Sequence, residues 1–180
     1  MTSLSEKILA IDQALREAGL AHAFGGALAL AWCTQRARGT IDIDVNVFTG
    51  VGRTREVFTA LPDGVLWSDE DVERTEVDGQ VRLWWGETPV DVFLNTTDFH
   101  DQVAARTRLE QFSGEEVPFL SCTDLAVFKA FFNRTKDWAD LEEMAEVGTL
   151  DLDRLVGVLV RYLGATDERI KRLRSLDRSG

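Results

Sequence analysis

The sequence predicts a mixed α/β fold (α+β, with a mixed β-sheet) that continues into an all-helical C-terminal part. Two observations support this prediction. Residues 40–48 alternate between polar and apolar side chains and are rich in β-branched residues, which is typical of a strand. Beyond about residue 122, apolar residues recur only at helical spacing. We therefore divide the chain into an α/β core, residues 1–121, and a helical part packed on that core, residues 122–180.

Each expected element follows from a local pattern. Apolar residues three or four apart predict a helix over 3–18 that ends at Gly19. Gly25-Gly26 precedes a short, almost wholly apolar helix over about 27–32, and a helix over about 52–61 ends at Pro62. A hairpin turn is expected at Asp78-Gly79. Further strands are expected near 65–68, 72–77, 80–85 and 89–94, and the last two helices over 151–163 and 167–176.

The overall composition excludes several classes of protein. The 180 residues carry 31 acidic and 20 basic side chains, a net charge of -11, which disfavours broad electrostatic capture of nucleic acid. No stretch approaches the ~20 apolar residues that cross a bilayer, so we expect no membrane partner. The two cysteines, Cys33 and Cys122, show no metal-site spacing and form no disulfide framework, so we expect them to be reduced in a cytoplasmic protein.

The strand over 40–48 carries the main chemical signal. Alternation places Ile41, Ile43, Val45 and Val47 on one face and Thr40, Asp42, Asp44 and Asn46 on the other. The two carboxylates then lie ~7 Å apart and repel each other unless a cation lies between them, and Mg²⁺ prefers such ligands. The alternative is a sheet whose outer face is simply solvated, and the strand alone does not decide between the two.

A third carboxylate and a pair of glycines extend this signal. Asp91 interrupts the apolar strand Val90–Leu94, either as a hydrogen-bonded residue of the strand or as a third member of the cluster. Three converging carboxylates are what a two-metal phosphoryl-transfer site requires. Gly25-Gly26 lets the backbone approach a ligand, and the amide groups at the start of the following helix bind phosphate.

In this order, the motifs resemble those of the nucleotidyltransferase superfamily of DNA polymerase β type. The resemblance depends on Gly25-Gly26, on the run from Arg38 to Asp44, and on Val90-Asp91-Val92. The run from Asp124 through Lys129 to Asp137 and Asp140 resembles the helical half of the AbiEii/MenT-like branch, which contains toxins of toxin–antitoxin systems. The likeness covers about residues 20–145 and implies a nucleotidyltransferase fold.

The resemblance also implies a role for each matching residue. It implies that Asp42, Asp44 and Asp91 bind Mg²⁺, with Asp91 as the third ligand or the general base. It implies that five residues contact the nucleoside triphosphate: Gly25, Gly26, Arg38, Thr40 and Lys129. Read from the residues alone, Arg38 is either a surface charge or a phosphate ligand, and Lys129 either extends its ammonium to water or faces a phosphate. Ala27 departs from the pattern, because the branch often has Ser or Thr near this position.

We therefore expect a Mg²⁺-dependent nucleotidyltransferase that moves NMP from an NTP to a hydroxyl of an RNA such as tRNA, a protein or a small molecule. A toxin role, with an antitoxin protein as partner, is part of this expectation. The rival hypothesis is a catalytically degenerate module that binds a nucleotide or a partner protein. Trp84-Trp85 points one ring to each face of the sheet, one toward the core and the other free to stack on a base.

Overall fold

The computed structural model describes residues 2–176. Within them the chain forms two compact units. The first contains residues 2–28 and 39–120, and the second contains residues 29–38 and 121–176. The sequence-based division at residue 121/122 assigns residues 29–38 to the first part, whereas in the structure they group with the C-terminal helices.

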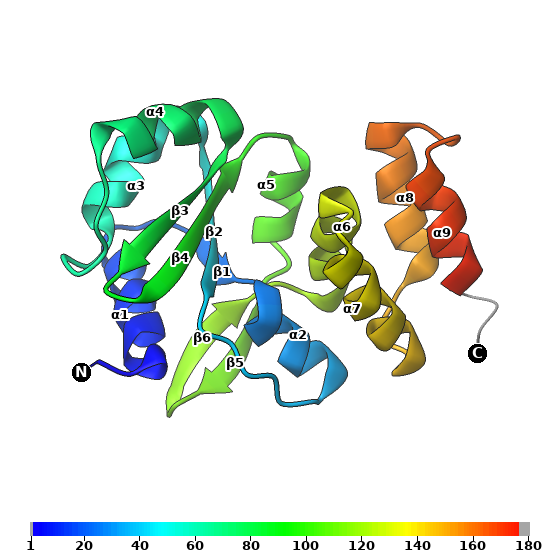
Figure 1. Cartoon of the computed structure of the whole chain (residues 1–180), viewed down its shortest axis with the longest axis horizontal. Coiled ribbons are helices and arrows are strands. Elements are labelled where there is room, and N and C mark those ends of the chain that lie inside the picture. The colour runs from blue at the N-terminus through cyan, green and yellow to red at the C-terminus, as the bar shows by residue number, and fades with distance from the viewer. Residues whose placement is uncertain (1, 177–180) are drawn as a thin grey trace. The chain divides into compact units, whose positions relative to one another are not determined.

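A six-stranded mixed sheet forms the centre of the first unit (Figure 1). Its strand order is β3-β4-β2-β1-β6-β5, with parallel pairs β2–β4 and β1–β6 and antiparallel pairs elsewhere. This mixed α/β architecture confirms the predicted fold class. The strands are β1 (His22–Phe24), β2 (Ile43–Gly50), β3 (Gln80–Trp85), β4 (Thr88–Asn95), β5 (Arg108–Phe112) and β6 (Glu115–Phe119).

The helices of this unit pack against the sheet and each other. They are α1 (Leu4–Glu17), the 3-10 turn η1 (Val51–Arg53), α3 (Thr54–Ala60), α4 (Asp69–Asp78) and α5 (Phe99–Ala104), and α2 (Gly26–Thr34) begins here and ends in the second unit. Ser3 and Glu6 form a capping box at the start of α1, whose buried face consists of Ile8, Ile11 and Leu15. The predicted helix over 3–18 is therefore confirmed.

Alternation along the central strands separates the core from the outer face. The side chains of Ile43 on β2, Val90 on β4 and Leu83 on β3 are at most 1% exposed and are neighbours in register. Each buried residue contributes ~1.5–3 kcal/mol of transfer free energy, so this apolar row fixes the register of all three strands. The polar residues between them must then share the opposite face.

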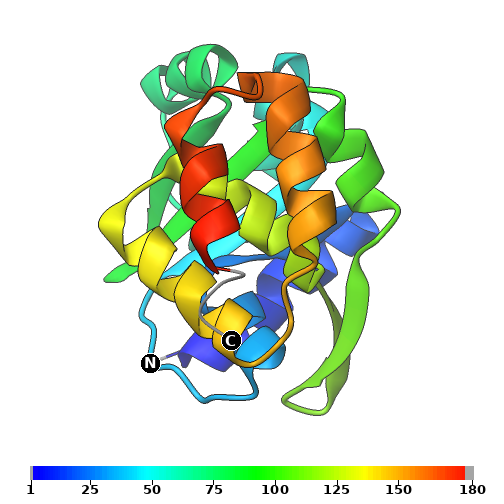
Figure 2. The ribbon, with the colours of Figure 1, turned by 90° about the vertical axis from the view of Figure 1, so that its right-hand side faces the viewer.

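The second unit consists of helices. Its own helices are α6 (Cys122–Phe132), α7 (Thr135–Glu146), α8 (Leu152–Leu163) and α9 (Glu168–Leu176), and they confirm the helical pattern predicted after residue 122. Figure 2 shows α8 and α9 lying side by side. Trp138 of α7 is 1% exposed and lies under the guanidinium of Arg172 in α9, 4.2 Å from the ring centroid. No helix among residues 2–176 is long and apolar enough to cross a membrane.

The strand predicted over 72–77 is wrong, because these residues belong to α4. Ser68 caps this helix in a capping box with Asp71, and three acidic residues occupy its first turn. Val72 and Thr75, three residues apart, are its buried side chains. The predicted turn at Asp78-Gly79 is instead the end of the helix, where Gly79 adopts φ +71°. The strand predicted near 65–68 is only an isolated bridge between Leu66 and Trp84.

The strand predicted over 40–48 begins later than expected, at Ile43. Pairing with β4 starts at Ile43 and pairing with β1 at Val45, so the chain before Ile43 has no strand partner. Ile41, which we expected on the apolar face, is 72% exposed. Asp42 precedes the strand and owes its position to a local turn rather than to alternation.

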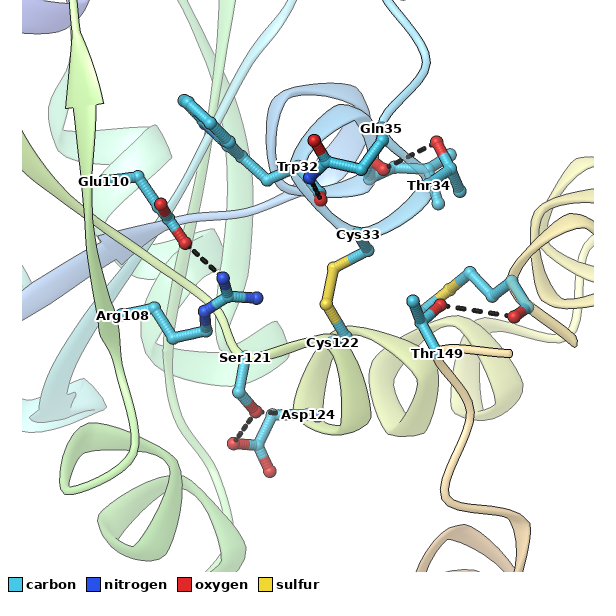
Figure 3. Close-up of a disulfide and its surroundings, with 12 residues drawn as sticks. Trp32, Cys33, Thr34, Gln35, Arg108, Glu110, Ser121, Cys122, Asp124 and Thr149 are labelled. Atoms are coloured by element: carbon cyan, nitrogen blue, oxygen red, sulfur yellow. Dashed lines mark hydrogen bonds and ion pairs between the residues drawn. A yellow bond between two sulfur atoms is a disulfide. The ribbon is translucent and has the colours of Figure 1, made fainter. Parts of the chain in front are cut away.

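The expectation of two reduced cysteines is also wrong. Cys33 near the end of α2 and Cys122 at the start of α6 form a disulfide, with Cα atoms 5.5 Å apart (Figure 3). Both lie in the second unit and are separated by 89 positions in sequence, so spacing alone gave no signal of their pairing. Disulfides are rare in the cytosol, and the expected cytoplasmic location therefore loses the support it drew from reduced cysteines.

Candidate functional site

Three charged side chains form one row across the outer face of the sheet. Asp44 on β2 is the register partner of Asp91 on β4, and Asp91 is in turn the register partner of Arg82 on β3. Neighbouring strands lie ~4.8 Å apart, so both aspartates start from adjacent backbone positions on the same face. The structure thus brings Asp44 and Asp91 together, with a guanidinium at the end of the row.

Arg82 joins the carboxylates of two separate segments. Its Nε donates to Asp91 Oδ1 at 2.8 Å and its Nη2 to Asp91 Oδ2 at 2.7 Å, a bidentate pair. The same Nη2 donates to Asp42 Oδ2 at 3.1 Å. Hydrogen bonding to Asp91 and the charges of Asp91, Asp42 and Asp44 raise the pKa of Arg82, against an opposing effect of burial. The Arg82 guanidinium therefore interacts electrostatically with all three predicted metal ligands.

Gly26 places the start of α2 against the carboxylate of Asp44. A Cβ at this position would lie 1.9 Å from Asp44 Oδ2, and the backbone has φ +53°. Both constraints require glycine here. Gly25 anchors the same corner, because its backbone N–H donates to the Asp44 carbonyl at 2.9 Å. Asp44 thus lies beside the positive end of a nine-residue helix, where backbone N–H groups and the helix dipole favour anions.

Thr40 shapes the segment that carries Asp42. The Thr40 hydroxyl accepts a hydrogen bond from the Asp42 backbone N–H at 3.1 Å and donates to the Asp42 carbonyl at 3.2 Å. This local turn orients Asp42 toward Arg82, so Thr40 positions a carboxylate in the structure. Gly39, Thr40, Ile41 and Asp42 line a widely open depression beside it.

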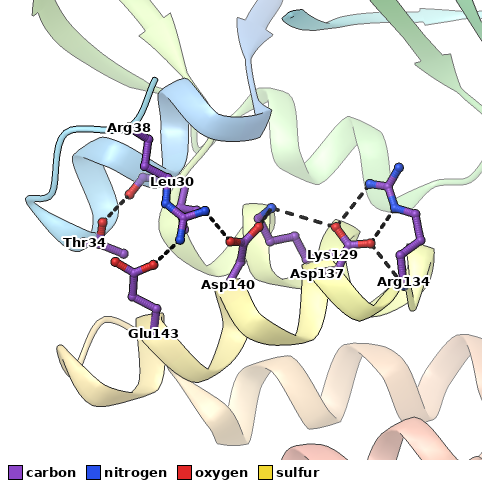
Figure 4. A network of polar contacts seen from close by, with 8 residues as sticks. All are labelled: Leu30, Thr34, Arg38, Lys129, Arg134, Asp137, Asp140 and Glu143. Carbon is purple, nitrogen blue, oxygen red and sulfur yellow. Dashed lines mark hydrogen bonds and ion pairs between the residues drawn. The ribbon is translucent and has the colours of Figure 1, made fainter. Parts of the chain in front are cut away.

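Arg38 and Lys129, the two predicted nucleotide-binding cations of the second unit, are paired with carboxylates there (Figure 4). Arg38 donates to Asp140 Oδ1 at 2.7 Å and to Glu143, and Lys129 Nζ donates to Asp140 Oδ2 at 2.7 Å. Burial opposes the charge of Arg38, but its bonds to Glu143 and Asp140 raise its pKa. Asp137, which Arg134 binds through two nitrogens, extends the chain of ion pairs. This network ties residues 29–38 to α7, as the disulfide ties them to α6.

The carboxylates on this face of the sheet are the type of ligand that a divalent cation such as Mg²⁺ prefers. Within residues 2–176, no three His, Cys, Asp or Glu side chains are gathered as ready metal ligands, and the guanidinium of Arg82 balances the carboxylates instead. Mg²⁺ needs only one or two protein carboxylates and completes its octahedron with water and phosphate oxygens. Gly26 keeps the space beside Asp44 free of a side chain. Asp42, Asp44 and Asp91 are the residues that would hold the ion.

Our sequence analysis did not identify Arg82 as a partner of Asp91 and Asp42. A signal was present, because two residues, Gly86 and Glu87, separate Trp85 from Thr88. Such a tight hairpin fixes the register, and counting back from the turn pairs position 82 with position 91.

Comparison with known proteins assigns the fold. No family model and no curated protein matches the sequence. Among solved structures, the solution structure of the antibiotic-resistance factor ANT(2'')-Ia aligns over 97% of this chain and 91% of its own, with 19% identity and a TM-score of 0.54. The chain has the fold of a nucleotidyltransferase.

Two further structures share this nucleotidyltransferase fold. The crystal structure of ANT(2'')-Ia in complex with adenylyl-2''-tobramycin is 18% identical, covers 97% of both chains and gives a TM-score of 0.54. The lincosamide antibiotic adenylyltransferase LnuA, bound to lincomycin, is 12% identical over 82% of this chain and 99% of its own, also with a TM-score of 0.54. At such identities the likeness establishes the architecture, and the chemistry has to be argued from the residues of this chain.

Proposed function

We propose that this chain is a Mg²⁺-dependent nucleotidyltransferase that moves NMP from an NTP to a hydroxyl of a small molecule. The observation that carries the proposal is the register row of Asp44, Asp91 and Arg82, in which Arg82 also bonds to Asp42. One guanidinium offsets only part of the negative charge of these three carboxylates, and a bound cation would offset the rest. A phosphoryl-transfer site must bind cations between a triphosphate and an attacking oxygen.

Each candidate site residue of the first unit has a stated role in this proposal. The backbone amides that follow Gly26 hold phosphate oxygens, since Ala27 supplies no hydroxyl. Asp42, Asp44 and Asp91 bind the metal, which when bound polarises the α-phosphate and offsets charge in the transition state. Asp91 also orients the acceptor hydroxyl and takes its proton. The acceptor oxygen forms a bond to the α-phosphorus while the bond from that phosphorus to pyrophosphate breaks.

Arg82 holds Asp91 in place for this step. A bidentate guanidinium fixes the plane and direction of the carboxylate that receives the proton. Arg38 and Lys129 are engaged by Asp140 within the second unit, so we assign phosphate binding to the first unit alone.

Two arguments favour a small molecule over RNA as the acceptor. The net charge of -11 opposes a long polyanion. Two of the structurally similar proteins were solved with an antibiotic or an adenylylated antibiotic, which supports an acceptor of this size.

The test is to incubate the protein with each NTP, Mg²⁺ and a panel of hydroxylated small molecules that begins with tobramycin and lincomycin. We expect an adduct whose mass exceeds that of the acceptor by one NMP less one water. Asp44→Asn and Asp91→Asn are expected to abolish the adduct, and Asp63→Asn, a change at an exposed residue of the same unit, to keep it. Nucleotide binding without transfer to any acceptor would instead support the rival hypothesis, a catalytically degenerate binding module.

The resemblance of residues 124–141 to the AbiEii/MenT-like branch favours a second candidate function, a toxin neutralised by an antitoxin protein. Induced expression is then expected to arrest bacterial growth, and Asp44→Asn to relieve the arrest. Normal growth during high expression of the unaltered chain would contradict the toxin role without affecting the transferase proposal.

A further inference from the structure

Strand β3 presents a second feature on the carboxylate face of the sheet. Its burial alternates, with Val81 and Leu83 buried and Gln80, Arg82 and Trp84 exposed. Because Arg82 bonds to Asp91, the exposed row of β3 lies on the same face as the carboxylates. Trp84 is 47% exposed although it is a large aromatic residue, and it lies two positions, ~7 Å, along the strand from Arg82.

Leu66 adds a second apolar group beside Trp84. Its backbone N–H donates to the Trp84 carbonyl at 2.9 Å, and the two residues form an antiparallel bridge. Residues directly opposite in an antiparallel pair direct their side chains to the same face, with Cβ atoms ~5 Å apart. Leu66 is 69% exposed. The two side chains together form an exposed apolar surface beside a charged cluster, a combination that is typical of a binding site.

The strand order determines which substrate this surface faces. The order β3-β4-β2-β1 places the carboxylates of β4 and β2 in the middle. The start of α2, which follows β1 and which we assign to the triphosphate, lies on one side of them. Trp84 and Leu66 lie on the other side. Trp84 pairs with Pro89, two positions along β4 from Asp91, the residue that takes the acceptor proton in the proposed function. A molecule that contacts both Asp91 and Trp84 is therefore the acceptor.

We infer that Trp84 and Leu66 form an acceptor platform, on which a ring of a small hydroxylated molecule packs while one of its hydroxyl groups reaches Asp91. This inference rests on the proposed function and adds the chemical class of the acceptor. The ~7 Å between Trp84 and Arg82 leaves both side chains within reach of one ring-containing molecule. An indole face packs well against the C–H face of a sugar or a flat ring, and Arg82 beside it is able to bind a ring hydroxyl.

A binding experiment tests the platform without any transfer. The chain has five tryptophans, so protein that contains 5-fluorotryptophan gives five ¹⁹F resonances, and Trp84→Phe identifies the one from Trp84. We expect phenyl or methyl β-D-glucoside to shift the Trp84 resonance saturably and D-sorbitol, which has no ring, to leave it unchanged. A Trp84 resonance that responds to no glycoside, responds equally to sorbitol, or responds only to a single-stranded RNA oligonucleotide would overturn the inference.

A kinetic experiment separates this inference from the proposed function. With an acceptor identified by the mass assay, Trp84→Ala is expected to raise the acceptor KM about tenfold, the usual loss for a stacked ring, and to leave the NTP KM unchanged. Leu109→Ala, which removes a 62% exposed apolar side chain from β5 at the other edge of the sheet, is the matched control and should change neither. If Trp84→Ala transfers NMP with an unchanged acceptor KM, the acceptor platform is wrong but the proposed function stands. Failure of the wild type to transfer to any acceptor overturns the proposed function, and the ¹⁹F titration still decides the platform.

Discussion

Replacing Arg82 by glutamine tests whether its guanidinium stands in for a metal ion. Arg82 donates three hydrogen bonds to Asp91 and Asp42, and Arg82→Gln removes this positive charge from beside both carboxylates. A unit charge and a divalent ion ~5 Å apart repel by ~1.7 kcal/mol in water and by more in a protein environment. Arg82 is about half exposed, so we use the lower value. Arg82→Gln should therefore bind Mg²⁺ about 15-fold more tightly than the wild type.

The same substitution should also lower stability when no metal is present. Charge-assisted hydrogen bonds contribute ~1.5–3 kcal/mol each when buried, and with the exposure of Arg82 we expect a loss of ~1–2 kcal/mol in the free energy of unfolding. Mg²⁺ should restore part of this loss, because it binds the folded state.

Isothermal titration with Mg²⁺ and urea unfolding with and without 10 mM Mg²⁺ measure both effects. Arg74→Gln, which removes an exposed arginine paired with Glu70 on α4, is the control and should leave Mg²⁺ affinity unchanged. Equal Mg²⁺ affinity in the wild type and Arg82→Gln would refute the electrostatic reasoning.

Three further predictions follow from single features of the structure. Gly26→Ala should destabilise the chain by about 2 kcal/mol or more and weaken NTP binding, because its Cβ would clash with Asp44. The control is Gly39→Ala, whose Cβ would have no atom within 4 Å and which should change neither the melting temperature nor the NTP affinity. Cys33→Ser together with Cys122→Ser should lower the unfolding free energy by ~2–5 kcal/mol, as expected for closing a loop of 89 residues; an unchanged urea midpoint would contradict the bond. Hydrogen bonds from Arg169 lower the pKa of Asp167 from 3.8 to about 2. The Asp167 carboxylate therefore stabilises the fold above about pH 4, and this contribution is lost as the pH falls toward 2. Asp167→Asn should flatten that part of the stability profile, and an identical acid slope in urea titrations would argue against it.

The parts of the fold that follow a single period were predictable from the sequence. Strands β3 and β4 and the helices after residue 122 appear close to where their patterns place them. In each of these elements, the burial of one face and the intrinsic propensity of the residues favour the same secondary structure. The pattern also identified Asp44 and Asp91 as polar residues between apolar β-branched ones, but their convergence depends on the pairing of β2 with β4, which the sequence left open.

Other features depend on contacts that sequence patterns do not contain. Residues 72–77 contain two valines and a threonine, but the cap at Ser68 and the burial of Val72 and Thr75 favour a helix. Strands β5 and β6 have no strict alternation, since β5 is largely exposed, and we did not predict them. The pairing of Arg38 with Asp140 joins positions 102 residues apart, and only tertiary structure creates it.

The most direct measurement of the central claim is a titration of free Mn²⁺ by electron paramagnetic resonance, in the presence of a non-hydrolysable NTP analogue. Our account predicts stoichiometric Mn²⁺ binding by the wild type and at least a tenfold loss of affinity in Asp44→Asn/Asp91→Asn, while Asp63→Asn binds like the wild type. Equal Mn²⁺ binding by all three proteins would show that these carboxylates hold no metal and would contradict the account.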